Sequence, residues 1–142
     1  MRMSKLLGFT VFALLFVQAH AEPLNGSRGS ASGPGWQSSW LDLHSPTSFR
    51  SGEKLRLSVS GTAENIVVRL LPNGAPPSGS AGIEGGRRTM PVDGILEIEL
   101  SRSHPDVVQI SVHGGRSAWD YALGANNGSV NLVSVERISD AG

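Results

Sequence analysis

The sequence predicts an all-β fold, an antiparallel β-sandwich of about seven to eight strands with either a jelly-roll or an Ig-like topology. From Trp36 onward the apolar side chains alternate with a period of two rather than 3.6, and no stretch of this region has a convincing helical period. Eighteen Gly and eight Pro supply turn residues between the alternating segments, which recur about every 10 to 15 residues. These patterns favour two packed antiparallel sheets.

The first clear strand is residues 54–60, KLRLSVS, in which leucine and valine share one face while lysine, arginine and serine share the other. Such alternation is typical of a half-buried strand. Residues 65–71, NIVVRLL, are apolar on both faces except for Arg69, which predicts a more central strand closed by the turn at 72–74. The following loop, 73–88, carries almost no large apolar side chains, so we expect a mobile surface loop.

Two further strands are expected at 95–100, ILEIEL, and at 107–112, VVQISV. In the first of them Glu97 and Glu99 alternate with apolar residues, which predicts that both carboxylates face solvent. A glycoside hydrolase needs a pair of carboxylates, and these two are the candidates for one, but the alternation accounts for them without catalysis.

The last expected strand is residues 130–138, VNLVSVERI, which is rich in β-branched side chains. Its apolar positions shift phase between Leu132 and Val133, and this shift predicts a β-bulge. Residues 40–43 and 118–123 are shorter candidates for strands.

The first 21 residues have the layout of a secretory signal peptide. Arg2 and Lys5 give a positive start, residues 6–17 are mostly apolar, and the sequence AHA at 19–21 offers small residues for cleavage. As a helix, the twelve-residue apolar run rises about 18 Å against roughly 30 Å of hydrocarbon core. We expect cleavage after Ala21, a secreted or periplasmic protein, and no membrane insertion after cleavage.

Domain organisation follows from composition. Residues 22–35, EPLNGSRGSASGPG, predict a flexible leader rich in Gly, Ser and Pro. We expect a single β-sandwich domain over residues 36–142.

Composition excludes several classes of chemistry. The chain has no Cys, so disulfides, thiol catalysis and Cys-based zinc sites are ruled out. It has 12 basic and 12 acidic residues, and loss of Arg2 and Lys5 with the signal peptide leaves ten basic against twelve acidic. We therefore expect no nucleic-acid partner.

The densest group of chemically versatile residues lies in 110–124, ISVHGGRSAWDYALG. An oxyanion-hole loop of the α/β-hydrolase type needs a Gly-x-Ser-x-Gly elbow, which the chain lacks. A tight connection between strands would use the freedom of Gly114 and Gly115. A ligand-binding rim would combine flat aromatic faces with aimed polar groups, here supplied by His113, Arg116, Trp119, Asp120, Tyr121 and Asn127.

Two pairs of aromatic side chains could either pack in the hydrophobic core or form a platform for a ligand. Trp119 and Tyr121 share a face at period two, and Trp36 and Trp40, four residues apart, also share a face of a strand. Because large aromatic side chains on strands most often pack in cores, core packing is the default expectation for Trp36 and Trp40. The alternative is that one closes the bottom of the sandwich and the other is exposed at its edge.

No cofactor and no metal centre are expected. The three His that remain after the signal peptide lack the spacing of a metal site. Sandwiches of this kind can hold a structural calcium ion with isolated carboxylates as ligands, but no acidic run in this chain resembles an EF-hand loop. The candidate calcium ligands are Asp42, Asp93, Asp106 and Asp120.

The order of features resembles galactose-binding-domain-like jelly rolls and related carbohydrate-binding modules. The resemblance rests on a segment with Phe49, Gly52, Glu53, Leu55 and Leu57, and on a late strand, VVQISV, that leads into an aromatic-bearing loop. It spans residues 36–138 and implies a β-sandwich that binds sugars through loop aromatics, often with a structural calcium ion. Such an aromatic would correspond to Trp119 or Tyr121.

Taken together, the sequence predicts an exported, non-enzymatic β-sandwich binding module, with glycan as the first expected ligand. The alternative is a protein–protein accessory module of the cell envelope that docks through a sheet face or an edge strand. A third alternative is a small hydrolase that uses Glu97 and Glu99.

Overall fold

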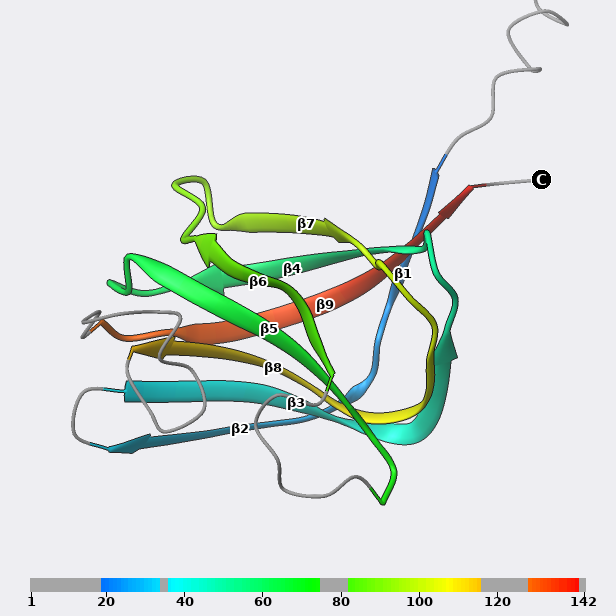
Figure 1. Cartoon of the computed structure of the whole chain (residues 1–142), viewed down its shortest axis with the longest axis horizontal. Helices are drawn as coiled ribbons and strands as arrows, with labels where there is room; N and C mark the ends of the chain where they lie inside the picture. Colours follow the sequence, from blue (N-terminus) through cyan, green and yellow to red (C-terminus); the bar gives the residue numbers. More distant parts are fainter. Residues whose placement is uncertain (1–18, 34–35, 75–81, 116–127, 141–142) are drawn as a thin grey trace, which may run out of the picture.

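The computed structural model describes residues 19–33, 36–74, 82–115 and 128–140, and within these ranges the chain forms β-strands and no helix (Figure 1). The strands form two antiparallel sheets, so the predicted all-β sandwich is confirmed. Since no helix occurs in the described part of the chain, none there is long and apolar enough to cross a membrane.

The two sheets contain four and five strands. The first has, in spatial order, β1 (Ala19–Pro23), β9 (Asn131–Asp140), β4 (Lys54–Ser60) and β7 (Ile95–Glu99). The second has β2 (Gly26–Gly33), β3 (Trp36–Phe49), β8 (His104–Gly115), β5 (Asn65–Pro72) and β6 (Ile83–Thr89).

The strand order is that of a jelly roll. In one sheet β9 lies between β1 and β4, and in the other β8 lies between β3 and β5. The chain crosses between the sheets so that each holds four strands in jelly-roll order, and β2 is an additional edge strand of the second sheet. Of the two topologies that the sequence left open, the chain has the jelly roll rather than the Ig-like one.

The core lies between the inward faces of the two sheets. Alternation along β4 buries Leu55, Leu57 and Val59, as the sequence predicted, and these side chains belong to the same buried cluster as Ile66 and Leu70 of β5. The other members of the cluster are Leu41, Phe49, Ala63, Val68, Ile98, Leu100, Val107, Ile110, Val112, Val130, Leu132 and Val135. Aliphatic side chains make up nearly all of this interior, as expected for a chain without disulfides.

The predicted β-bulge in the last strand is present. Ser58 of β4 lies opposite Ser134, whereas the next residue, Val59, lies opposite Leu132. Val133 is therefore the extra residue of β9, and its side chain is 44% exposed. The bulge allows Leu132 and Val135 both to reach the core.

Two segments expected to be irregular are strands. Residues 26–33, within the segment predicted as a flexible leader, form β2, which pairs with β3 along its whole length. Residues 83–89, within the predicted mobile loop, form β6, where Gly85 and Gly86 adopt positive φ angles of 73° and 66°. Neither strand carries the apolar alternation on which sequence prediction relies, because polar or small side chains hold both of them in place.

The candidate strands at 40–43 and 118–123 have different outcomes. The first is the middle of β3, which is 14 residues long. The second lies outside the described residues. Farther toward the N-terminus, residues 19–21 of the expected signal peptide belong to β1, which runs beside the end of β9 (Figure 1).

Candidate ligand-binding face

The outward face of the five-stranded sheet carries both tryptophans of β3. Along this strand Ser39 and Leu41 are buried between the sheets, and the hydroxyl of Ser39 accepts a hydrogen bond at 2.8 Å from the backbone N–H of Leu132 in the other sheet. Because successive side chains alternate, Trp36 and Trp40 must point away from the core. The prediction that they pack in the core is therefore wrong.

Cross-strand register places polar residues beside Trp40 on the same face. Ser111 of β8 lies opposite Trp40, and Arg69 of β5 lies opposite Ser111. In the next row Gln109 of β8 lies opposite Asp42 of β3. Burial lowers the pKa of the Arg69 guanidinium, which still remains charged at physiological pH. We call this surface the tryptophan face; it comprises Trp36, Trp40, Asp42, Arg69, Gln109, Ser111 and His113.

Each tryptophan lies over a glycine of β2. Gly29 is directly opposite Trp40, and Gly33 is directly opposite Trp36. A Cβ atom on Gly29 would lie 2.5 Å from Nε1 of Trp40, and one on Gly33 would collide with Nε1 of Trp36. The glycines of β2 thus leave the space that the indole rings occupy, and a side chain at Gly29 or Gly33 would collide with a ring.

Two hydrogen bonds fix the polar groups next to Trp40. The indole Nε1–H of Trp40 donates to Oδ2 of Asp42 at 3.1 Å, and Nε2 of Gln109 donates to Oδ1 of the same carboxylate at 2.9 Å. Asp42 is exposed, and a carboxylate has about four lone-pair sites, so each oxygen can accept a further hydrogen bond. The carboxylate is thereby oriented beside an aromatic ring and remains open to a ligand.

His113 is the one residue of the predicted rim that the described part of the chain contains. It lies on the outward face of β8, is only 3% exposed, and its ring stacks on Trp36 with centroids 5.5 Å apart and an interplanar angle of 9°. It therefore lies beneath or beside an aromatic side chain rather than projecting into solvent. The other predicted rim residues, Arg116, Trp119, Asp120, Tyr121 and Asn127, lie outside the described residues.

Spacing was the signal that could have identified the tryptophan face from sequence. Gly29 and Gly33 are four residues apart, as are Trp36 and Trp40. In an antiparallel hairpin these two spacings bring each glycine opposite one tryptophan, a cross-strand pairing in which the ring covers the glycine.

Of the carboxylates proposed as calcium ligands, Asp42 and Asp93 have hydrogen-bond partners in the described structure, and Asp120 lies outside the described residues. Asp42 accepts the two hydrogen bonds described above, and Oδ1 of Asp93 accepts the backbone N–H of Ile95 at 3.0 Å in the turn before β7. Asp106 has a φ of 49°, and its backbone N–H donates to the hydroxyl of Ser48. The described ranges contain no group of three His, Asp or Glu side chains that could hold a metal ion.

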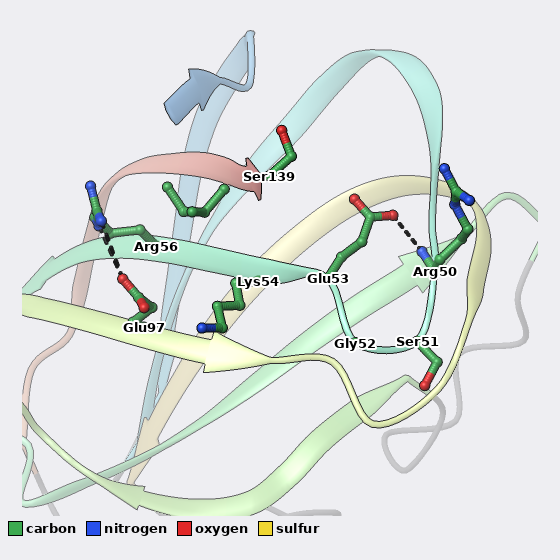
Figure 2. Close-up of a pocket in the computed structure, with 9 residues that line it drawn as sticks. Arg50, Ser51, Gly52, Glu53, Lys54, Arg56, Glu97 and Ser139 are labelled. Carbon is green, nitrogen blue, oxygen red and sulfur yellow. Dashed lines mark hydrogen bonds and ion pairs between the residues drawn. The ribbon is translucent and has the colours of Figure 1, made fainter. Parts of the chain in front are cut away.

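A second candidate site is an open pocket of about 510 Å³ on the outward face of the four-stranded sheet (Figure 2). Arg56 lies within 3.2 Å of Glu97 and within 3.7 Å of Glu136. Glu53, also in the lining, pairs with Arg137 at 2.9 Å. Glu97 is therefore held by an arginine, and the pocket is lined by a partly solvated network of ion pairs.

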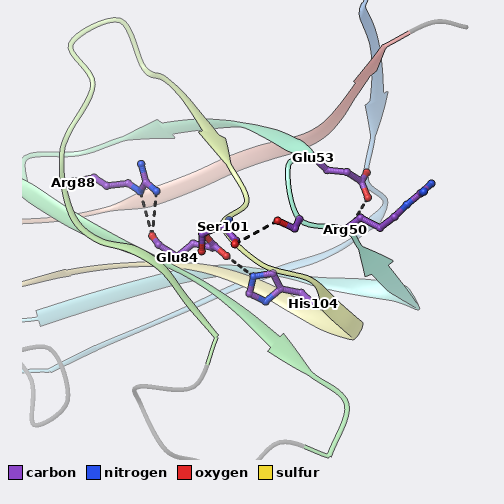
Figure 3. A network of polar contacts seen from close by, with 7 residues as sticks. Arg50, Glu53, Glu84, Arg88, Ser101 and His104 are labelled. Carbon is purple, nitrogen blue, oxygen red and sulfur yellow. Dashed lines mark hydrogen bonds and ion pairs between the residues drawn. The ribbon is translucent and has the colours of Figure 1, made fainter.

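A third polar site, at the start of β6, is buried (Figure 3). Glu84 is completely buried; its Oε2 lies 2.5 Å from Nε2 of His104, and its Oε1 accepts the backbone N–H of Ser101 at 2.9 Å. Burial by itself raises the pKa of the Glu84 carboxyl, but the hydrogen bonds from His104 and Ser101 outweigh it and hold this pKa below its ordinary value. This pair ties β6 to the start of β8.

Together these features define a jelly-roll β-sandwich with two indole rings and an oriented carboxylate on one outer sheet face. No family model matches the chain, and no curated protein matches it. Among solved structures, it is similar to chitosan-binding module 1 of a chitosanase/glucanase from Paenibacillus sp. IK-5, with 15% identity, a TM-score of 0.47, and coverage of 86% of this chain and 93% of that one.

Proposed function

We propose that the protein is a non-enzymatic glycan-binding module and that the tryptophan face is its site. The observation that carries the proposal is the pair of indole rings on an outer sheet face, outside the hydrophobic core, with an oriented carboxylate beside one of them. Aromatic side chains on an outward face need a reason other than core packing, and a stacking platform for a ligand supplies one.

The chemistry of the face suits a sugar. The apolar C–H face of a pyranose ring packs on an indole, and the ring hydroxyls then need acceptors and donors at its rim. Asp42 can accept from hydroxyl groups next to Trp40, and Gln109 holds that carboxylate in place. Because these groups are already oriented by hydrogen bonds to one another, little side-chain entropy is lost when a ligand binds.

Export belongs to the same proposal. The first 21 residues would direct the chain out of the cytoplasm, and the mature protein would act in the periplasm or outside the cell, where polysaccharides are accessible. N-terminal sequencing of the protein isolated from its host tests this part, with Glu22 as the expected first residue. A mature protein that still begins at Met1 contradicts it.

A retention assay on insoluble and immobilised polysaccharides tests the function. We expect the wild type to be retained on at least one polysaccharide, and Trp40→Ala to lose retention because it removes both the stacking ring and the donor to Asp42. Ile95→Ala is the matched control, because Ile95 is a 44% exposed apolar side chain on the other sheet. Equal retention of Trp40→Ala and wild type would show that the tryptophan face is not the site.

The alternative function, a protein–protein accessory module, is favoured by one feature. The strand β2 lies at the edge of its sheet and its residues are mostly exposed, so an extended segment of a partner could pair with its free side. Crosslinking in the native host distinguishes the two functions. A specific protein partner attached through residues 26–33, together with no polysaccharide retention, would replace the glycan proposal by this one.

A further inference from the structure

The spacing of the two tryptophans indicates how a glycan would lie on the tryptophan face. Trp36 and Trp40 are four residues apart on one strand, which separates their Cα atoms by about 13 Å at a strand rise of roughly 3.3 Å per residue. This distance exceeds the length of one pyranose ring. Both rings are seated over glycines of the same neighbouring strand, so they form a platform that follows β3.

The two ends of this platform differ in chemistry. Trp40 donates to Asp42, which also accepts from Gln109, so this end offers polar groups as well as an aromatic ring. Trp36 instead stacks on the buried ring of His113 and lies over Gly33. Its contacts with these two residues are therefore with an aromatic ring and with the glycine backbone. A sugar unit at Trp40 can be recognised by its hydroxyls, whereas a unit at Trp36 gains mainly stacking energy.

We propose that the tryptophan face binds internal units of a linear polysaccharide whose chain runs along β3, rather than a single terminal sugar. This inference rests on the proposed function. The subsite at Trp40 provides recognition at every chain length, and the subsite at Trp36 adds affinity only when the chain is long enough to reach it. Asp42 is a positioning and specificity residue of the first subsite.

The test measures dissociation constants by isothermal titration calorimetry for cello-, xylo-, malto- and chito-oligosaccharides of one to six units. In the series that binds, we expect affinity to rise with length by about two- to tenfold and to level off once both rings are covered, since the second stacking contact adds to the binding free energy. Trp36→Ala should flatten this dependence, so that long and short oligosaccharides bind alike. Trp40→Ala and Asp42→Asn should weaken binding at all lengths.

Conservative variants separate the inference from damage to the fold. Trp36→Phe keeps an aromatic face, and we expect it to retain part of the length dependence that Trp36→Ala loses, while both variants keep the circular dichroism spectrum of the wild type. The inference that the face binds internal units of a linear polysaccharide is overturned if a monosaccharide binds as tightly as its longest oligomer, or if Trp36→Ala also weakens binding of the monosaccharide. The glycan-binding function stands in either case. If no oligosaccharide binds and no polysaccharide retains the protein, both are overturned.

Discussion

Substitution of Gly29 by Ala tests whether the edge strand positions the aromatic platform. A Cβ atom at this position would lie 2.5 Å from Nε1, 2.7 Å from Cε2 and 2.9 Å from Cζ2 of Trp40. Ordinary contacts are about 3.5–4.0 Å, so the indole must withdraw by about 1 Å. Such a movement stretches the 3.1 Å hydrogen bond from Trp40 to Asp42 beyond its useful range.

The free energy of unfolding is expected to change little in Gly29→Ala. The lost hydrogen bond costs about 0.5–1.5 kcal/mol, while the lower conformational entropy of alanine in the unfolded chain offsets about 0.4–1 kcal/mol. The informative measurement is therefore the position of the ring rather than the melting temperature.

Nuclear magnetic resonance of the indole N–H groups makes that measurement. We expect one of the three tryptophan indole resonances to move upfield in Gly29→Ala, because its donor loses the carboxylate acceptor, and we expect oligosaccharide binding to weaken about three- to tenfold. Ser30→Ala, on the same strand with its side chain on the opposite face, should leave all three resonances in place. An unchanged indole spectrum in Gly29→Ala would refute the account of β2 as the support of Trp40.

Three further substitutions test the fold. Because the folded state holds the pKa of Glu84 below its ordinary value, its ionised form stabilises the protein above about pH 4.3, and this contribution is lost as the pH falls through the lowered pKa. Denaturant titrations should therefore show that wild-type stability falls more steeply than that of Glu84→Gln on acidification from pH 7 to pH 3, whereas parallel slopes would contradict the role of the carboxylate. Leu57→Ala removes a completely buried side chain and should lower the free energy of unfolding by about 2–5 kcal/mol in urea melts, and a loss near zero would mean that Leu57 is not in the core. Arg56→Ala breaks exposed ion pairs with Glu97 and Glu136 and should cost no more than about 1 kcal/mol, a loss that added salt should diminish.

Local alternation was sufficient to predict the strands that bury one apolar face. In β4 every second side chain is aliphatic, and in β9 the change of phase at Val133 identified the bulge without any knowledge of its partner strand. These features depend on neighbouring residues of one segment, so they can be recognised in the sequence alone.

β2 and β6 could not be recognised in this way, because their stabilisation comes from residues distant in sequence. Gly29 has no side chain and is covered by Trp40 of the next strand. Glu84 is a charged residue, which sequence patterns assign to the surface, yet its contacts with His104 and the N–H of Ser101 allow it to be completely buried. Such pairings become visible only when the strands are placed beside one another.

The faces of β3 were assigned the wrong way round for a related reason. Of its inward residues near the tryptophans, Gln37 and Ser39 are polar, and they bind the backbone N–H groups of Val130 and Leu132 at 2.7 and 2.8 Å. Hydrophobicity alone therefore placed the tryptophans inside. At this end of the sandwich the inward positions of β3 hold polar side chains that bind the other sheet, and the tryptophans that alternate with them lie on the outer face.

The position of β1 has a consequence for the export that we propose. The bond after Ala21 lies in the middle of this strand, whose residues pair with β9 from Ala19 opposite Asp140 to Pro23 opposite Glu136. A processing peptidase needs its substrate segment unpaired, so a precursor that completes this ladder hides the bond to be cut. Under the proposed export, cleavage after Ala21 would therefore have to precede the pairing of β1 with β9, and the mature protein would keep only Glu22 and Pro23 of this strand.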